Sequence, residues 1–126
     1  MTENELATIV VNCCYQIHRK LGPGLLESVY EEVLSYELNK VNIPHVRQLA
    51  IPIVYDSIIL ASAFRADIVV ADKLIVEIKS VETIAAVHQK QLLTYLRLTK
   101  RKLGLLVNFN TSLIKDGLQR IVNGLY

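Results

Sequence analysis

The first forty residues carry apolar side chains at helical spacing. Six of them recur at intervals of three or four residues: Leu6, Ile9, Val10, Cys13, Ile17 and Leu21. Thr2 and Glu5 have the spacing of a capping box, which marks a helix start, and Gly22-Pro23-Gly24 interrupts the stripe. A second apolar stripe runs from Leu26 to Lys40. The chain is therefore predicted to open with two helices, over residues 3–21 and 26–40.

From residue 46 the pattern changes to β-branched residues and alternation. Four segments have this character, over residues 49–55, 57–64, 67–70 and 74–79. They predict antiparallel strands that are joined by short turns. Pro52 lacks a backbone donor, so the first of these strands is expected at an edge of the sheet or at a bulge.

The last third of the chain alternates between helix and strand patterns. We expect a helix over residues 83–100, a short buried strand over 104–109, and a last helix over 112–126 that Gly117 weakens. The predicted order is ααββββαβα. Because a helix separates the strand ending near Ser80 from the strand beginning near Leu103, a right-handed crossover makes these two strands parallel. The expected fold class is mixed α/β, with a central mixed sheet flanked by helices in one domain, residues 1–126.

Composition limits the classes of function. At 126 residues the chain can bury one core but not two, and its net charge of +2 does not by itself argue for nucleic acid. No apolar run approaches the roughly 18 residues of a membrane span. Glu3 and Glu5 stand where a secretory signal would carry positive charge. We therefore expect a cytoplasmic protein with no membrane contact.

The two cysteines, Cys13 and Cys14, are adjacent in the first predicted helix. Their side chains diverge by about a quarter turn, which makes a mutual disulfide geometrically poor. We expect both to be reduced. A metal or redox role is the minority interpretation, because no CxxC or Cys/His spacing accompanies them.

Two carboxylates face each other in the predicted hairpin. Asp67 and Glu77 are symmetric about Asp72, so a turn centred there places them on opposite strands at the same level. Paired carboxylates repel each other unless solvent or a cation lies between them, and they are what Mg²⁺ or Mn²⁺ binds. Lys79 emerges on the same strand face as Glu77 and is placed to orient a water or to accept its proton.

The same pattern has a purely structural interpretation. In a solvated strand, Leu74, Val76 and Ile78 would point inward, while Ile75, Glu77 and Lys79 would point outward as a modest surface pair. Taken alone, residues 74–79 favour this interpretation, because alternation is common on half-exposed strands.

Two polar residues of the predicted helices favour the metal site over the structural interpretation. Glu27 borders the apolar stripe of the second helix, where it can reach the sheet as a third oxygen ligand, although acidic residues also suit a helix N-terminus for dipole reasons. Gln91 shares a helix face with Tyr95 and is expected to be buried against the sheet, where it needs hydrogen-bond partners. His88 lies nearby and is more typical of a partly buried core histidine, so we leave it outside the site.

Several cations are candidates for contact with phosphates. Arg65 precedes Asp67 by two residues on the same strand face, where its guanidinium can hold a phosphate or the carboxylates. Arg97, Lys100, Arg101 and Lys102 form a local basic cluster. The alternative for this cluster is a solvated helix C-terminus, whose dipole cations also suit.

These residues resemble a known family. Residues 24–30 read GLLESVY, similar to the signature of the GxxExxY proteins, and Asp67 followed by Glu77-Ile78-Lys79 resembles the PD-(D/E)XK nuclease superfamily to which they are assigned. The likeness extends through QLLTY at 91–95 and covers nearly the whole chain. Ala66 stands where the literal Pro-Asp would have its proline.

The resemblance implies a restriction-endonuclease-like core with a site for Mg²⁺ or Mn²⁺. Asp67, Glu77 and the backbone carbonyl of Ile78 would bind the metal, and Lys79 would lie near the attacking water. By position, Glu27 would be the acidic residue of the helix and Gln91 the polar residue of the following helix. Candidate substrate-binding residues are Arg65, Tyr95, Tyr30, Arg97, Lys100 and Arg101.

Three functional hypotheses follow. The first is a Mg²⁺-dependent nuclease acting on DNA more readily than on RNA, with Asp67, Glu77, Lys79, Glu27 and Gln91 as its catalytic set. The second is a catalytically silent module that binds nucleic acid or a protein partner, since so small a core has few elements for gripping a duplex unless it forms a homodimer or recruits a partner. The third is a structural domain, in which Glu77 and Lys79 would be exposed and remote from Glu27.

Overall fold

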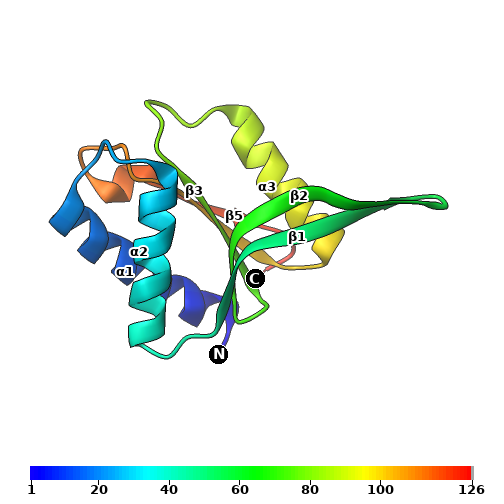
Figure 1. The fold of residues 1–126 in the computed structure, drawn as a ribbon, viewed down its shortest axis with the longest axis horizontal. Coiled ribbons are helices and arrows are strands. Elements are labelled where there is room, and N and C mark those ends of the chain that lie inside the picture. The colour runs from blue at the N-terminus through cyan, green and yellow to red at the C-terminus, as the bar shows by residue number, and fades with distance from the viewer. Residues whose placement is uncertain (126) are drawn as a thin grey trace.

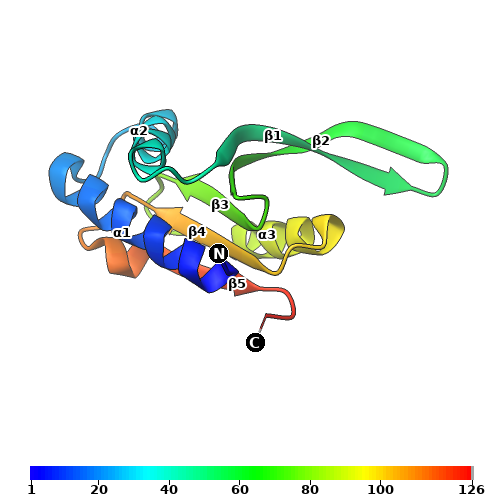
Figure 2. The same cartoon turned by 90° about the horizontal axis from the view of Figure 1, so that it is seen from below.

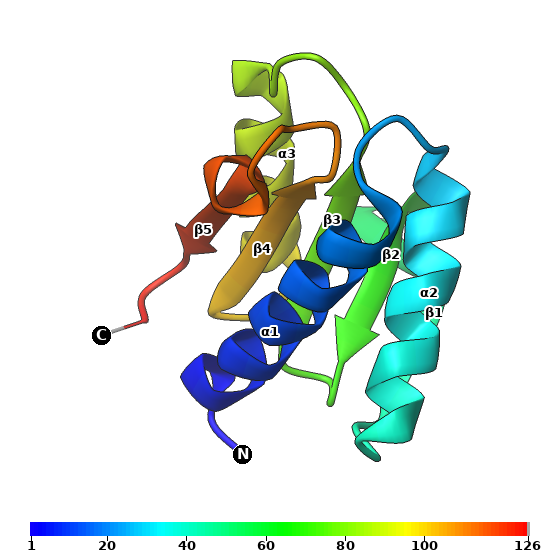
Figure 3. The same cartoon turned by 90° about the vertical axis from the view of Figure 1, so that its left-hand side faces the viewer.

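A computed structural model describes residues 1–125 and has three layers (Figures 1 and 3). The middle layer is a five-stranded mixed sheet with strand order β1-β2-β3-β4-β5. Helices α1 (Glu3–Leu21) and α2 (Glu27–Lys40) cover one face, and α3 (Ala86–Thr99) covers the other. The predicted fold class is confirmed: the sheet and its helices fit a restriction-endonuclease-like core.

The strands are β1 (His45–Tyr55), β2 (Ile58–Val70), β3 (Leu74–Lys79), β4 (Leu103–Asn108) and β5 (Leu118–Val122). The first three form an antiparallel meander, β4 pairs parallel with β3, and β5 pairs antiparallel with β4. The parallel pair is the one that the crossover helix predicted.

Two predicted elements are wrong. Segments 57–64 and 67–70 are one continuous strand, β2, because nothing in the short stretch between them forces a turn. The predicted C-terminal helix is instead a 3₁₀ turn (Ile114–Gly117) followed by β5, while residue 126 of that prediction lies outside the described residues. Gly117 packs so closely on the backbone of Asn108 that a Cβ atom would lie 2.1 Å from its carbonyl oxygen. This approach directs the chain into the ladder with β4.

The first helix follows its sequence signals. Thr2 and Glu5 form the predicted capping box, with Glu5 N donating to Thr2 Oγ1 at 3.1 Å and Thr2 N donating to Glu5 Oε1 at 3.2 Å. Cys13 and Cys14 are free, as expected, and both are buried. Among residues 1–125, no helix has the length and apolar character needed to cross a membrane. The cytoplasmic location stays a prediction.

The core lies on both faces of the sheet. Toward α1 and α2, side chains such as Ile68, Val76 and Val107 pack against Tyr30 and Leu34. Toward α3, a second cluster consists of Ile51, Ala66, Val69, Ile75, Leu92, Leu96 and Leu106. The alternative interpretation, in which one face of β3 is solvated, is therefore wrong, because α3 covers that face and only Lys79 of this strand escapes burial.

One part of the molecule stands apart from these layers. The paired ends of β1 and β2 project beyond the body as a two-stranded ribbon (Figures 1 and 2). We call residues 53–60 the arm; its pairs are Ile53↔Leu60, Val54↔Ile59 and Tyr55↔Ile58. At the base of the arm the register shifts between Ile51 and Ile53, and β1 is an edge strand, so both predictions from Pro52 are confirmed.

Candidate active site

The predicted carboxylates lie at a fork in the sheet. Strands β2 and β3 pair only from Val70↔Leu74 to Ile68↔Val76 and then separate. Their turn has positive φ at Ala71 (49°) and Asp72 (59°), the backbone form that matches strand twist in tight hairpins. This register confirms the predicted symmetry about Asp72, and it places Asp67 and Glu77 directly beyond the last pair.

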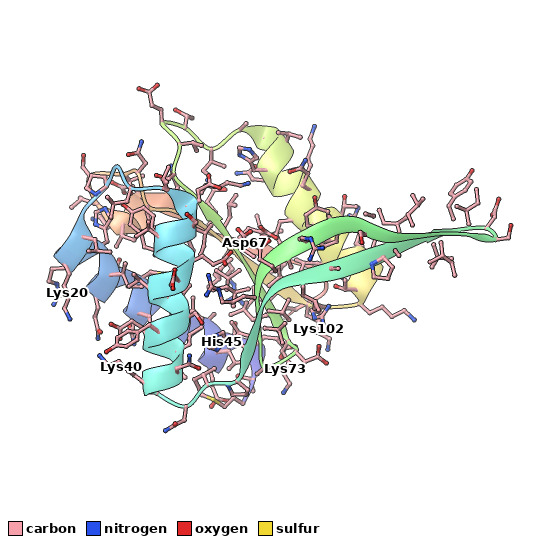
Figure 4. All side chains as sticks on the ribbon, viewed as in Figure 1. Lys20, Lys40, His45, Asp67, Lys73 and Lys102 are labelled. Atoms are coloured by element: carbon pink, nitrogen blue, oxygen red, sulfur yellow. The ribbon has the colours of Figure 1, made fainter. Side chains whose placement is uncertain are left out.

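The backbone of β3 holds Asp67 at this fork. Asp67 Oδ2 accepts a hydrogen bond from Ile78 N at 2.8 Å, so the side chain takes a place that a strand carbonyl would occupy in a continued ladder. Its other oxygen, Oδ1, accepts a longer bond from Gln48 Nε2 at 3.4 Å. Figure 4 labels Asp67 near the centre of the molecule, at the base of the projecting ribbon.

The partner carboxylate is buried and incompletely satisfied. Glu77 is 9% exposed, and its Oε1 atom has no hydrogen-bond partner within the described residues. Burial, and next the negative charge of Asp67, raises the pKa of Glu77 to about 9. Without a cation the side chain therefore holds its proton at neutral pH, and a bound cation would reverse this preference.

A cavity of about 170 Å³ opens beside this pair. It is lined by Arg65, Asp67, Glu77, Lys79, His88, Gln91, Leu92, Tyr95 and Leu106. The structure thus brings together side chains from β2, β3 and α3 that the sequence proposed for one site. Gln91 lines the cavity but is exposed, so its expected burial is wrong. His88, which we had left out, also lines it.

Glu27 approaches the same fork from the other helical layer. It is the first residue of α2, is exposed, and its Oε2 atom accepts a hydrogen bond from Ser80 N at 3.1 Å, just past the end of β3. An adjoining cavity of about 360 Å³ is lined by Glu27, Ser28, Glu31, Gln48 and Asp67. Asp67 therefore borders both cavities. The third hypothesis is wrong, because Glu77 is buried and Glu27 contacts the residue that follows Lys79.

The fit to a divalent cation rests on two carboxylates. Within residues 1–125, no group of three or more His, Cys, Asp or Glu side chains is gathered closely enough to hold a metal ion. Mg²⁺ commonly takes one or two carboxylates and completes its shell with water and substrate phosphate. Asp67, Glu77 and the carbonyl of Ile78 match that donor set, and the unpartnered Oε1 atom of Glu77 is an oxygen that a cation would satisfy.

The sequence analysis did not identify three residues that support Asp67: Glu31, Arg47 and Gln48. Glu31 is 7% exposed and forms an ion pair with Arg47 (Oε2 to Nη2, 3.0 Å). Its Oε1 accepts from Gln48 Nε2 at 2.5 Å, and the same amide nitrogen reaches Asp67. Gln48 has a positive φ of 51° inside β1, opposite Asp67 and unpaired in the ladder. Backbone strain of this kind clusters at functional sites, yet no local sequence signal announces it.

Other candidates do not reach the cavity. Tyr30 is 0% exposed, its hydroxyl donates to Gly22 O at 2.6 Å and accepts from Leu25 N at 3.2 Å, and its ring stacks on Phe109. The substrate-binding role assigned to Tyr30 is therefore wrong, and its contacts are structural.

The residues of the predicted basic cluster have different surroundings in the structure. Arg101 Nη2 pairs with Asp72 Oδ1 at 2.5 Å in the β2–β3 turn, with only 15% of its side chain exposed, so it is not the free cation that we expected. Arg97 and Lys100 are exposed near the end of α3 and do not line the cavity. Their contact with phosphate stays a prediction.

Comparison with known proteins agrees with this geometry. A model of the PD-(D/E)XK nuclease superfamily matches residues 4–121, a span that includes every residue of the fork and its cavity. Nucleases of this superfamily generally use divalent metals such as Mg²⁺ or Mn²⁺. Searches among curated proteins and among solved structures found no match. Because the family model covers nearly the whole chain, this protein belongs to the PD-(D/E)XK nuclease superfamily.

Proposed function

We propose that this protein is a metal-dependent nuclease that hydrolyses phosphodiester bonds, in DNA more readily than in RNA. The observation that carries the proposal is the carboxylate pair at a fork of the sheet, the half-buried Asp67 and the buried Glu77, beside Lys79 in a chain of the nuclease superfamily. Such a pair is costly in a protein that never binds a cation, because one carboxyl must stay protonated.

Each residue of the fork has a role in this proposal. Asp67, Glu77 and the carbonyl of Ile78 would hold Mg²⁺ or Mn²⁺. Glu27 would act through its hydrogen bond to Ser80 N, which fixes the end of β3 beside the pair. The cation would polarise the scissile phosphate and make a water more acidic. Lys79, two residues after Glu77 on β3, would position the attacking water.

Polar side chains of the cavity wall complete the proposed site. Arg65 from β2 and Tyr95 from α3 both line the cavity, where they would bind the phosphate. Gln91, one turn before Tyr95 on α3, orients the phosphate or a water.

We assign the chain to the GxxExxY group within the superfamily, as one nuclease-like domain over residues 1–126. The assignment is supported by what the signature residues do. Glu27 binds the backbone at the end of β3, and Tyr30 fixes the loop before α2 through Gly22 and Leu25. The signature therefore joins the helical layer to the fork.

The test is cleavage of single- and double-stranded DNA and RNA with Mg²⁺, with Mn²⁺ or with EDTA. Asp67→Asn and Lys79→Met are expected to lower the rate by about 100-fold or more, the size typical of losing one electrostatic group in an active site. Lys20→Met is the matched control, an exposed lysine at the far end of α1 (Figure 4). Cleavage that survives both site changes would refute the proposal.

The silent binding module remains the second candidate. It is favoured by one observation, that no third His, Cys, Asp or Glu joins the pair in the described part of the chain. Calorimetric titration with Mn²⁺ separates the two: the nuclease requires binding that Glu77→Gln weakens, whereas the silent module predicts no binding.

A further inference from the structure

The arm exposes large apolar side chains far from the body. Tyr55 is 69% exposed, Ile59 67% and Val54 63%, and Ile58 and Leu60 are also exposed. By the register of the ribbon, Ile53, Tyr55, Ile58 and Leu60 share one face. A contiguous apolar patch of this kind marks an interaction site on a folded protein, whereas single exposed apolar residues are ordinary.

The charge of the arm indicates which class of molecule the arm can bind. From residue 50 to residue 63 the only charged side chain is Asp56, at the tip, and there is no lysine or arginine. A segment that binds nucleic acid needs cations to meet the phosphates. The arm is therefore suited to a protein surface that is apolar and carries one positive charge.

The chain itself has a surface of that description. A groove of about 480 Å³ runs between α1, β4 and β5, on the sheet face opposite α3. Ala7, Val11, Leu105 and Leu118 give it an apolar floor, and Arg120 is its cation. The volume lies in the range of pockets that hold a small-molecule ligand.

The two unpaired charges are complementary. Among residues 1–125, neither Asp56 nor Arg120 takes part in an ion pair. The arm cannot reach the groove of its own chain, because it projects away from the body and its tip stands clear of every other element (Figure 2). The arm could therefore reach this groove only on another copy of the chain.

We propose that the arm of one copy docks in the α1–β4–β5 groove of a second copy, with Asp56 meeting Arg120 at the rim of the groove. Exchange in both directions about a two-fold axis makes the contact twice and closes a dimer, whereas one-way docking would build an open chain. The apolar face of the arm supplies the binding energy, and the single charge pair fixes the register. The proposal concerns assembly and stands apart from nuclease activity.

The test is sedimentation velocity of the full chain over a range of concentrations. Wild type is expected to form a dimer. Asp56→Lys and Arg120→Glu should each raise the dimer dissociation constant by about tenfold or more, and the double reversal should restore most of the affinity, as for a charge pair whose partners have been exchanged. Glu32→Lys and Lys20→Glu, exposed charges away from both surfaces, are controls that should leave the dimer unchanged.

A second variant separates the loss of the charge from strain in the turn. Asp56 has a φ of 52°, which a lysine tolerates poorly and an asparagine tolerates well. Asp56→Asn removes the charge and keeps the turn, so it should also weaken the dimer while thermal unfolding stays unchanged. A wild type that stays monomeric, a dimer that survives both reversals, or a double reversal without recovery would each overturn the proposal.

The two proposals fail independently. Asp67→Asn should lower cleavage by about 100-fold or more and leave sedimentation unchanged, because Asp67 binds Gln48 and Ile78 and is part of neither the arm nor the groove. Nucleic-acid binding that is lost on Asp56→Asn with no change in assembly would show that the arm serves the substrate, and the dimer proposal would be wrong.

Discussion

Strand β2 passes through two environments that reverse the usual distribution of polarity. Near its end, Ala66 and Ile68 are buried, and beside them lie the half-buried Asp67 and the buried Glu77 of β3. Near its start, Ile58 and Ile59 are exposed on the arm. Polar groups are buried in one region and large apolar groups are exposed in the other, and each reversal costs stability. Such departures are expected where a chain has a function to perform.

The fork explains how one strand has both environments. β2 pairs with β1 along both its body and its arm, but with β3 over only three residue pairs. Beyond Ile68 strand β2 no longer pairs with β3, and the gap that opens between them receives the carboxylates. The β1–β2 ribbon still packs on α3 through Ile51 and Ala66 and leaves the layered body only at the arm. The site and the arm are thus two results of the same separation of strands.

The largest expected difference between the regions is in the free energy of unfolding. Ile68→Ala removes a side chain that is 0% exposed and should cost about 2–5 kcal/mol, whereas Ile59→Ala on the same strand should change stability by less than about 0.5 kcal/mol in the monomer. Urea unfolding at a concentration below dimer formation measures both. Equal losses would mean that the arm packs on its own body, contrary to the separation described above.

The pH dependence of stability should belong to the body alone. In metal-free protein the raised pKa of Glu77 means that the folded state keeps a proton up to about pH 9, while the unfolded chain loses it near the ordinary value of 4.5. The folded state is therefore favoured at low pH, and this contribution is lost as the pH rises from 4.5 toward 9.

The size of that effect can be measured by substitution. Glu77→Gln should remove the dependence and stabilise the metal-free protein by about 3 kcal/mol at pH 7. Asp56→Asn on the arm is the control and should leave the slope unchanged. Chemical unfolding in EDTA at several pH values provides the measurement, and identical slopes for wild type and Glu77→Gln would contradict the prediction.

The smallest expected effect concerns the support of Asp67. Gln48→Ala removes the amide that joins Glu31 to Asp67 and should cost about 1 kcal/mol, the net value of a typical hydrogen bond, with a loss of cleavage of about tenfold. Gln48→Gly removes the same amide but adopts the positive φ without strain, so its stability should be higher than that of Gln48→Ala.

A matched change on β2, just beyond the arm, sharpens this comparison. Ser62→Ala, on the exposed part of β2, should alter neither stability nor cleavage. If Gln48→Ala behaved like Ser62→Ala in both assays, the network behind Asp67 would have no influence on the site.

Features set by neighbours in the sequence were predictable. The capping box of Thr2 and Glu5 and the helical apolar spacing located α1, and the symmetry of Asp67 and Glu77 about Asp72 gave the hairpin register. Likewise Pro52 identified an edge strand with a register shift. In each case the physical cause lies within a few residues.

Features set by distant contacts were not predictable. Residues 118–122 became a strand because β4 offered an open edge, and a pattern that suited a helix was overridden by that pairing. Tyr30 was counted as a substrate ligand because nothing local indicates that Phe109 and Gly22 enclose it. The positive φ of Gln48 depends on Glu31 and Asp67, which lie on two other elements.

Pro52 also affects how this protein behaves at high concentration. An exposed apolar strand at a sheet edge is a template for open-ended cross-β growth, because incoming chains can pair with its free N–H and C=O groups. Pro52 offers no N–H at the base of the arm, and the register shift beside it interrupts the regular edge. Replacing it with valine would restore a continuous edge, and turbidity of concentrated solutions would then report aggregation that the native proline suppresses.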